Sequence, residues 1–218
     1  ISAFNLGWQP FYIKIGNNKN ASDTFGKIGT FFLRSLISIW GLIVFWTPRF
    51  MQIRIGDNHL IGEEFWASEQ IVSLIFLSYL FYAGYIVLMP SIYLLEKQNW
   101  APIFRGSGAI INISLNLLFI KYWGMLGAAL ATLVAYLGMF IIIYYKSNQW
   151  LKIACNWRSI GLHLIITATF ILFFEMTEKS LFISIGFTFI YLGLLLFFQG
   201  KTKLLSDFNY LKSSFSDA

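Results

Sequence analysis

The feature that most constrains this chain is a series of long, uninterrupted apolar stretches. They lie at about Ile28–Thr47, Gln70–Leu94, Ala101–Ile120, Met125–Tyr145, Ile160–Phe174 and Leu181–Phe198. A helix needs about 20 mostly apolar residues to cross the hydrocarbon core, whereas a membrane β-barrel shows alternating apolar and polar residues. The sequence therefore predicts an all-α integral membrane protein with about six transmembrane helices.

Composition excludes several other classes of protein. Of the 218 residues, 57% are hydrophobic and 12% are charged, and the charged share is about half that of a soluble domain. The net charge of +6 comes from basic residues that lie mostly between the apolar stretches, so we expect no nucleic-acid binding. A single cysteine, Cys155, excludes an internal disulfide framework.

The basic residues are distributed unevenly between the two sides of the membrane. If the six stretches alternate in direction, eleven Lys and Arg residues fall on one side and four on the other, which also holds most of the Glu residues. Loops rich in Lys and Arg stay in the cytoplasm. We therefore expect a multi-pass membrane protein with both ends of the chain in the cytoplasm.

The same pattern divides the chain into four regions. Residues 1–27 are predicted to be the end of a preceding helix and a cytoplasmic loop, 28–145 a unit of four helices, and 146–198 two additional helices. Residues 199–218 form a polar, mildly basic cytoplasmic tail that is either a short interfacial helix or disordered. Because the chain opens within an apolar segment at Ile1, we expect a longer protein of which this is the C-terminal part.

No constellation of catalytic residues is present in the sequence. The two histidines, His59 and His163, are predicted on opposite sides of the membrane and cannot share a metal ion. No acidic residue lies deep in an apolar stretch, since Glu69 and Glu175 mark stretch edges. We therefore predict no catalytic residue, no metal site and no cofactor.

Four polar side chains within the stretches are candidates for substrate binding. Arg34 either extends to the lipid headgroups or faces an aqueous cavity and binds an anion, for which a planar guanidinium is suited. Arg105 fits the same two alternatives, as an interfacial anchor or an anion ligand. Asn112 and Asn116 share one helix face, where they either bond to a neighbouring helix or line a polar cavity.

Backbone features suggest where helices bend and pack. Pro90 predicts a kink in the second stretch, either static or acting as a hinge, with Tyr82 and Tyr85 as candidate cavity residues just before it. Small residues recur at every fourth position of the fourth stretch, which predicts close helix packing. These residues are Gly127, Ala131 and Ala135.

Three segments resemble a known family. The run Asn112–Tyr136 contains an Asn-rich helix, a short turn with Gly124, and then Gly-Ala-Ala-Leu-Ala-Thr. Together with Trp8-Gln9-Pro10-Phe11 and Gly62-Glu63-Glu64-Phe65, it resembles the polysaccharide flippases of the multidrug/oligosaccharidyl-lipid/polysaccharide exporter superfamily. The resemblance covers essentially the whole chain, is most specific in Asn112–Tyr136 and is weak in the last two helices.

The resemblance implies a specific architecture and activity. The chain would be the C-terminal lobe of a fourteen-helix MATE-like transporter, with 28–145 inside that lobe and an N-terminal lobe missing. Its partners would be membrane lipid and a lipid-linked oligosaccharide, which it would move on an undecaprenyl pyrophosphate carrier from the cytoplasmic to the periplasmic leaflet for O-antigen, capsule or exopolysaccharide synthesis. It would lie in the bacterial cytoplasmic (inner) membrane and would not be an enzyme.

Two alternatives remain open. A multidrug or ion antiporter of the same fold would need a carboxylate in the membrane, which these stretches lack but a missing lobe could supply. A membrane-bound polysaccharide polymerase, ligase or acyltransferase would need a larger external loop or an embedded acid–base pair, and neither is present.

Overall fold

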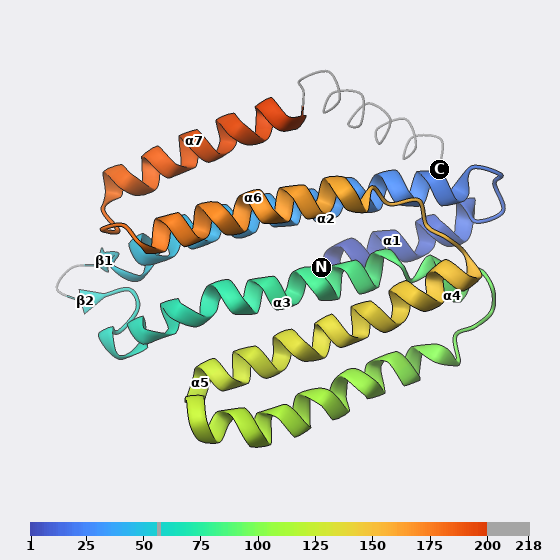
Figure 1. Ribbon diagram of the computed structural model, residues 1–218, viewed down its shortest axis with the longest axis horizontal. Coiled ribbons are helices and arrows are strands. Elements are labelled where there is room, and N and C mark those ends of the chain that lie inside the picture. The colour runs from blue at the N-terminus through green and yellow to red at the C-terminus, as the bar shows by residue number, and fades with distance from the viewer. Residues whose placement is uncertain (56–57, 200–218) are drawn as a thin grey trace.

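The computed structural model describes residues 1–55 and 58–199 and is almost entirely helical (Figure 1). Its elements are α1 (Ser2–Ile15), α2 (Ala21–Met51), β1 (Arg54–Ile55), β2 (Asn58–His59), the 3-10 helix η1 (Glu63–Ser68), α3 (Glu69–Val87), α4 (Pro90–Tyr93), α5 (Trp100–Trp150), α6 (Trp157–Glu175) and α7 (Leu181–Gln199). The strands β1 and β2 form a two-residue antiparallel pair in the loop that follows α2.

The long helices lie side by side along the longest axis of the molecule (Figure 1). α2 packs against α3 and α6, α3 packs against α5, and α7 lies outside α2 and α6. α1 contacts α2 and the short helix α4. The prediction of an all-α protein is therefore confirmed.

Among the residues that the structure describes, four helices are long and apolar enough to cross a membrane: α2, the segment Ile71–Tyr93, α5 and α6. α5 has 51 residues and reverses direction near its middle (Figure 1), so its two arms coincide with the third and fourth predicted spans. α7 coincides with the sixth, but its described apolar part, Leu181–Leu195, is shorter. Membrane embedding is supported, and the count of six spans stays a prediction.

A single glycine makes the reversal of α5 possible. Gly124 has φ 53° and ψ −128°, a backbone conformation that side chains with a Cβ atom rarely adopt. Beyond it the two arms approach closely, since a Cβ atom on Gly127 would lie 2.3 Å from the carbonyl oxygen of Phe119. Ala131 and Ala135 follow on the same face and are buried.

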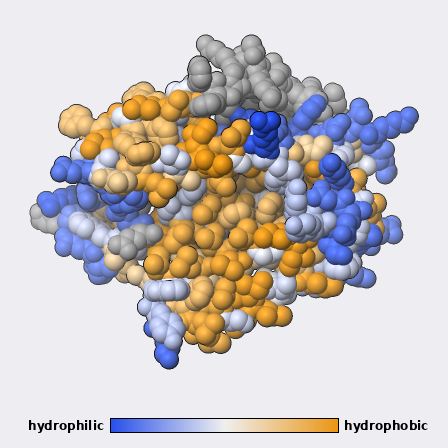
Figure 2. Space-filling view, in the orientation of Figure 1, coloured by the Kyte–Doolittle hydropathy of each residue, from blue (hydrophilic) through white to orange (hydrophobic). Residues whose placement is uncertain are grey.

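The outer surface has the pattern of a protein surrounded by lipid. A broad apolar belt covers the middle of the molecule and hydrophilic residues gather at its two ends (Figure 2). Large apolar side chains project outward from this belt, including Leu117 at 77% exposure and Leu172 at 66%. Without a membrane such exposure would be costly, because each large apolar side chain gains about 1.5–3 kcal/mol from leaving water.

The connections separate into two groups at opposite ends. The loops before α2, between α4 and α5 and between α5 and α6 lie at one end, which we call the basic end after Lys19, Lys97 and Lys152 (Figure 1). The loop that contains β1 and β2, the reversal of α5 and the α6–α7 loop lie at the other, the acidic end (Figure 1). This arrangement agrees with the predicted alternation, while the predicted tail, 199–218, lies outside the described residues apart from Gln199 in α7.

The predicted kink in the second span takes the form of a break. α3 ends at Val87, and Pro90 is the first residue of α4, where its missing N–H costs no helical hydrogen bond. Pro90 and its neighbour Ile92 are buried. The break therefore sits within a packed core at the basic end.

Candidate functional site

A polar recess of about 410 Å3 opens between α3 and the two arms of α5. We call it the Arg105 recess. Its polar walls are formed by Arg105 and Asn112 from the first arm, Thr132 and Tyr136 from the second arm, and Tyr82 from α3. One guanidinium, one amide and three hydroxyl groups thus converge in this recess.

Helix periodicity and the reversal at Gly124 explain why these residues meet. Arg105 and Asn112 are seven positions apart, which is two helical turns, so they lie on one face of the first arm. Thr132 and Tyr136 are four positions apart and share a face of the second arm. Because the chain turns back at Gly124, the two faces meet beside α3.

A short chain of hydrogen bonds organises the amide groups in and beside the recess. Asn116 Nδ2 donates to Asn112 Oδ1 at 2.9 Å, and Asn112 Nδ2 donates to Thr132 Oγ1 at 3.3 Å. Thr132 Oγ1 in turn donates to the Ala128 carbonyl at 3.0 Å. Asn116 Oδ1 is buried and accepts no hydrogen bond within the described part of the chain, so it can still accept one from a further donor.

Tyrosine rings form the wall of the recess on the α3 side. The ring centroids of Tyr82 and Tyr136 are 5.1 Å apart, and those of Tyr79 and Tyr136 are 5.7 Å apart. Tyr85, which the sequence groups with Tyr82, lies in the core instead and is 0% exposed. Its hydroxyl makes no hydrogen bond of regular geometry in the described residues. The Arg105 guanidinium lies close to this hydroxyl and interacts with it electrostatically.

An apolar groove adjoins the Arg105 recess. It has a volume of about 650 Å3 and is lined mainly by apolar side chains of α3, with Leu36 from α2. Tyr82 belongs to the walls of both the groove and the recess. A polar site and an apolar site therefore lie next to each other along α3, which is the arrangement an amphipathic ligand requires.

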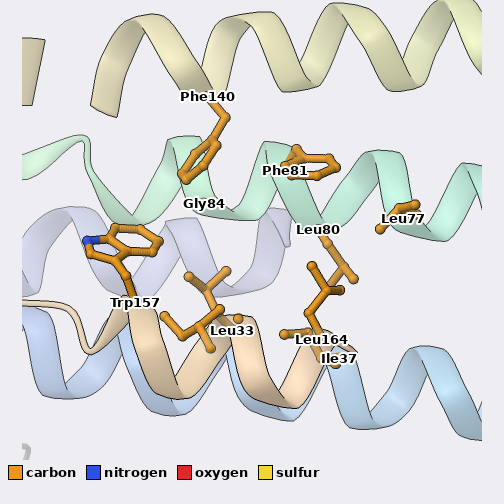
Figure 3. A pocket seen from close by; sticks show the side chains of 11 residues that line it. Leu33, Ile37, Leu77, Leu80, Phe81, Gly84, Phe140, Trp157 and Leu164 are labelled. Atoms are coloured by element: carbon orange, nitrogen blue, oxygen red, sulfur yellow. The ribbon is translucent and has the colours of Figure 1, made fainter. Parts of the chain in front are cut away.

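Arg34 lies in a different part of the molecule. It lines a recess of about 210 Å3 with Arg158 and His163 of α6, on the side of α6 that faces α7. Between this recess and α3 lies an apolar cavity of about 160 Å3 (Figure 3). The side chains that surround the cavity in that view include Leu33, Ile37, Leu80, Phe81, Phe140, Trp157 and Leu164. The structure therefore brings Arg105 and Asn112 together and separates Arg34 from them.

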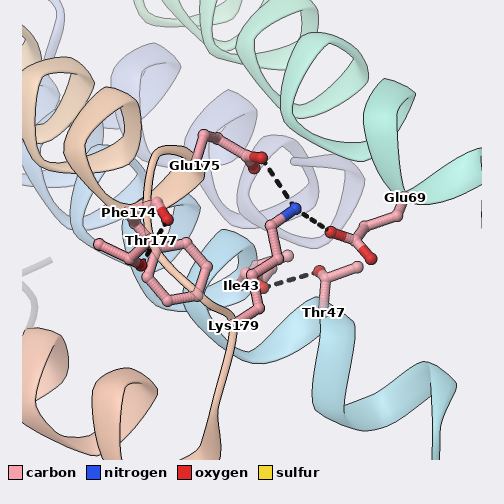
Figure 4. A network of polar contacts seen from close by, with 7 residues as sticks. All are labelled: Ile43, Thr47, Glu69, Phe174, Glu175, Thr177 and Lys179. Atoms are coloured by element: carbon pink, nitrogen blue, oxygen red, sulfur yellow. Dashed lines mark hydrogen bonds and ion pairs between the residues drawn. The ribbon is translucent and has the colours of Figure 1, made fainter.

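A charged cluster at the acidic end joins three segments (Figure 4). Lys179, in the α6–α7 loop, contacts the carboxylate of Glu69 at the start of α3 and lies 2.8 Å from Glu175 at the end of α6. Burial lowers the pKa of Lys179, but its hydrogen bonds to Glu175 and Glu69 outweigh this and raise the pKa above the ordinary value. The cluster holds helix ends together and is not part of either recess.

Neither metal binding nor similarity to known proteins adds evidence about the function of the candidate site. Among residues 1–55 and 58–199, no group of three or more His, Cys, Asp or Glu side chains is placed to hold a metal ion. No protein-family model, curated protein or solved structure matches the chain. The resemblance to polysaccharide flippases therefore stays an interpretation of the sequence.

Two polar residues of the Arg105 recess were not predicted from the sequence to bind substrate. Thr132 and Tyr136 lie within the segment that resembles the flippases, but as isolated polar residues in an apolar helix they gave no separate signal. Their contact with Asn112 and Tyr82 depends on the rotation of the second arm about its axis. That rotation is fixed by the close packing at Gly127, and only the structure reveals it.

Proposed function

We propose that the protein is a flippase that carries a lipid-linked oligosaccharide across the cytoplasmic membrane of a bacterium. The substrate class is an amphipathic lipid with a pyrophosphate-linked saccharide headgroup. The protein would act by transport and not as an enzyme. The basic end would face the cytoplasm, in agreement with the distribution of Lys and Arg.

One observation carries the proposal: the Arg105 recess and the apolar groove share the side chain of Tyr82. A guanidinium binds phosphate oxygens through a planar pair of donors, and amide and hydroxyl groups bond to sugar hydroxyls. The neighbouring groove offers apolar surface for a lipid chain. An antiporter for apolar cations has no need of this combination.

The Arg105 recess would also lower the free-energy cost of moving the headgroup across the membrane. Moving a charged, hydroxyl-rich headgroup through hydrocarbon without partners costs several kcal/mol for each polar group that is left unbonded. Arg105, Asn112 and Thr132 would replace part of the lost hydration. A second lobe would supply the opposite wall, and alternating exposure of the route would complete the transfer.

The test is the leaflet distribution of the lipid-linked oligosaccharide after the protein is depleted from cells that produce it. We expect the lipid to accumulate in the cytoplasmic leaflet, because its headgroup no longer has a route across the membrane, and wild-type protein should restore the distribution. An unchanged lipid pool together with increased drug sensitivity would contradict the flippase and favour the antiporter.

A further inference from the structure

A second basic recess lies on α2 and α6, away from the Arg105 recess. We call it the Arg158 recess. It has a volume of about 210 Å3, and its polar walls are formed by Arg34, Asn156, Arg158, Ser159 and His163. Its remaining walls are the apolar side chains Leu162, Ile166 and Leu195.

The charge of its lining favours an anion. Two guanidinium groups supply positive charge, the imidazole of His163 adds a polar ring, and no carboxylate is among the lining residues that the structure describes. The backbone N–H groups at the start of α6 add partial positive charge at the same place. An anion with several acceptor oxygens, such as a phosphate, matches this set of donors.

The polar walls are held in place by contacts outside the recess. The Asn156 side chain accepts a hydrogen bond from Ser159 N at 3.0 Å and so caps α6, while Asn156 N donates to Thr30 Oγ1 at 2.9 Å. His163 is buried, and its Nε2 lies 2.9 Å from the hydroxyl of Ser38 on α2. The start of α6 is thereby fixed against α2.

The depth of the recess distinguishes a lipid from a soluble ion. Its lining residues on α6 begin at Arg158, next to the loop, and continue to His163 and then Ile166. His163 is six residues beyond the first residue of α6, which corresponds to about 9 Å along the helix. The headgroup region on each side of a bilayer has a comparable thickness of about 5–7.5 Å. If α6 begins at the membrane surface, Arg158 and His163 would lie at headgroup level, and Ile166 and Leu195 would lie where an acyl chain begins.

We propose that the Arg158 recess binds the phosphate headgroup of an anionic membrane phospholipid. Arg158, which is exposed, would contact the phosphate from the membrane surface, and Arg34 would contact it from within the helix bundle. The apolar walls would receive the first carbons of one acyl chain. This proposal does not depend on the proposed flippase function, because the Arg158 recess and the Arg105 recess have no lining residue in common.

Native mass spectrometry of the full chain in a neutral detergent tests the proposal. We expect the wild-type protein to retain dioleoylphosphatidylglycerol in preference to dioleoylphosphatidylcholine, and inorganic phosphate to compete poorly. Arg158→Gln should reduce retention of phosphatidylglycerol about tenfold, the effect of losing one charge-assisted hydrogen bond. Arg34→Gln should act in the same direction.

Lys152→Gln is the matched control, because it removes one positive charge from an exposed side chain at the same end but outside the recess. It should retain phosphatidylglycerol as the wild type does. Equal retention of the two lipids by the wild type, or wild-type retention by Arg158→Gln, would overturn the proposal. Full displacement by millimolar phosphate would assign the recess to a soluble anion and overturn it as well.

Discussion

Asn112 and Thr132 connect the two arms of α5 across the reversal at Gly124, with Asn112 Nδ2 donating to Thr132 Oγ1 at 3.3 Å. Twenty positions separate the two residues in the sequence. The contact occurs inside the Arg105 recess. The same side chains therefore contribute both to packing of the arms and to the polar surface offered to a headgroup.

The Asn112–Thr132 bond should make a small, measurable contribution to stability. Interhelical hydrogen bonds in membranes contribute about 0.6–1.7 kcal/mol, so Thr132→Val, which keeps the side-chain shape, should lower the free energy of unfolding by about that amount. A double-mutant cycle with Asn112→Leu, followed by unfolding in mixed detergent, measures the coupling. A coupling energy near zero would show that the two side chains do not interact.

Gly124→Ala should destabilise the protein strongly, although it adds only one carbon atom. At φ 53° and ψ −128° a Cβ atom is strained even though the space around it is open, and such strain costs about 1–3 kcal/mol. Gly186→Ala is the control, since Gly186 lies in the helix α7 and also has open space around it. Thermal unfolding should show a lowered midpoint for Gly124→Ala alone; equal midpoints would contradict the strained reversal.

The Lys179 cluster should make stability depend on alkaline pH. Because the pKa of Lys179 is raised in the folded protein, the stabilisation is complete below the unfolded-state pKa and is lost as the pH rises through the higher folded-state pKa. We expect the free energy of unfolding to fall more steeply above about pH 10.4 in the wild type than in Lys179→Met. Parallel pH profiles for the two proteins would rule out a contribution from the cluster.

Cysteine labelling tests the orientation in the membrane. Burial, opposed by a hydrogen bond with Thr30, raises the pKa of the Cys155 thiol to about 12, so the native cysteine should react slowly with maleimides near neutral pH. In a Cys155→Ser background, an impermeant maleimide should label Glu178→Cys in intact cells and Asn17→Cys only after permeabilisation. Both positions are exposed and lie at opposite ends of the molecule. The reverse labelling would invert the orientation.

The positions of the helices could be predicted because the membrane demands long apolar segments. The stretch Ile160–Phe174 corresponds to α6, Trp157–Glu175, and the turn expected near Gly124 is the reversal of α5. Both features depend only on local sequence: apolar length in one case, and the conformational freedom of glycine in the other.

The composition of the polar sites could not be predicted in the same way. Arg34 and Arg105 are both basic residues near the start of an apolar stretch. They lie in different recesses because α2 packs against α6 and the first arm of α5 packs beside α3. Tyr82 and Tyr85 are three positions apart, and only Tyr82 reaches the Arg105 recess. Which neighbour each helix face meets is decided by tertiary packing, and spacing along one helix does not contain that information.

The central claim is that the headgroup crosses the membrane beside Arg105, and a rescue experiment in protein-depleted cells tests it most directly. The measured quantity is the initial rate at which lipid-linked oligosaccharide appears in the periplasmic leaflet after wild type, Arg105→Gln, Arg105→Lys or Lys152→Gln is supplied. The account predicts an initial flipping rate about tenfold lower for Arg105→Gln, an intermediate rate for Arg105→Lys because a single ammonium replaces the planar fork, and the wild-type rate for Lys152→Gln. Wild-type rates for Arg105→Gln at equal protein levels would contradict it.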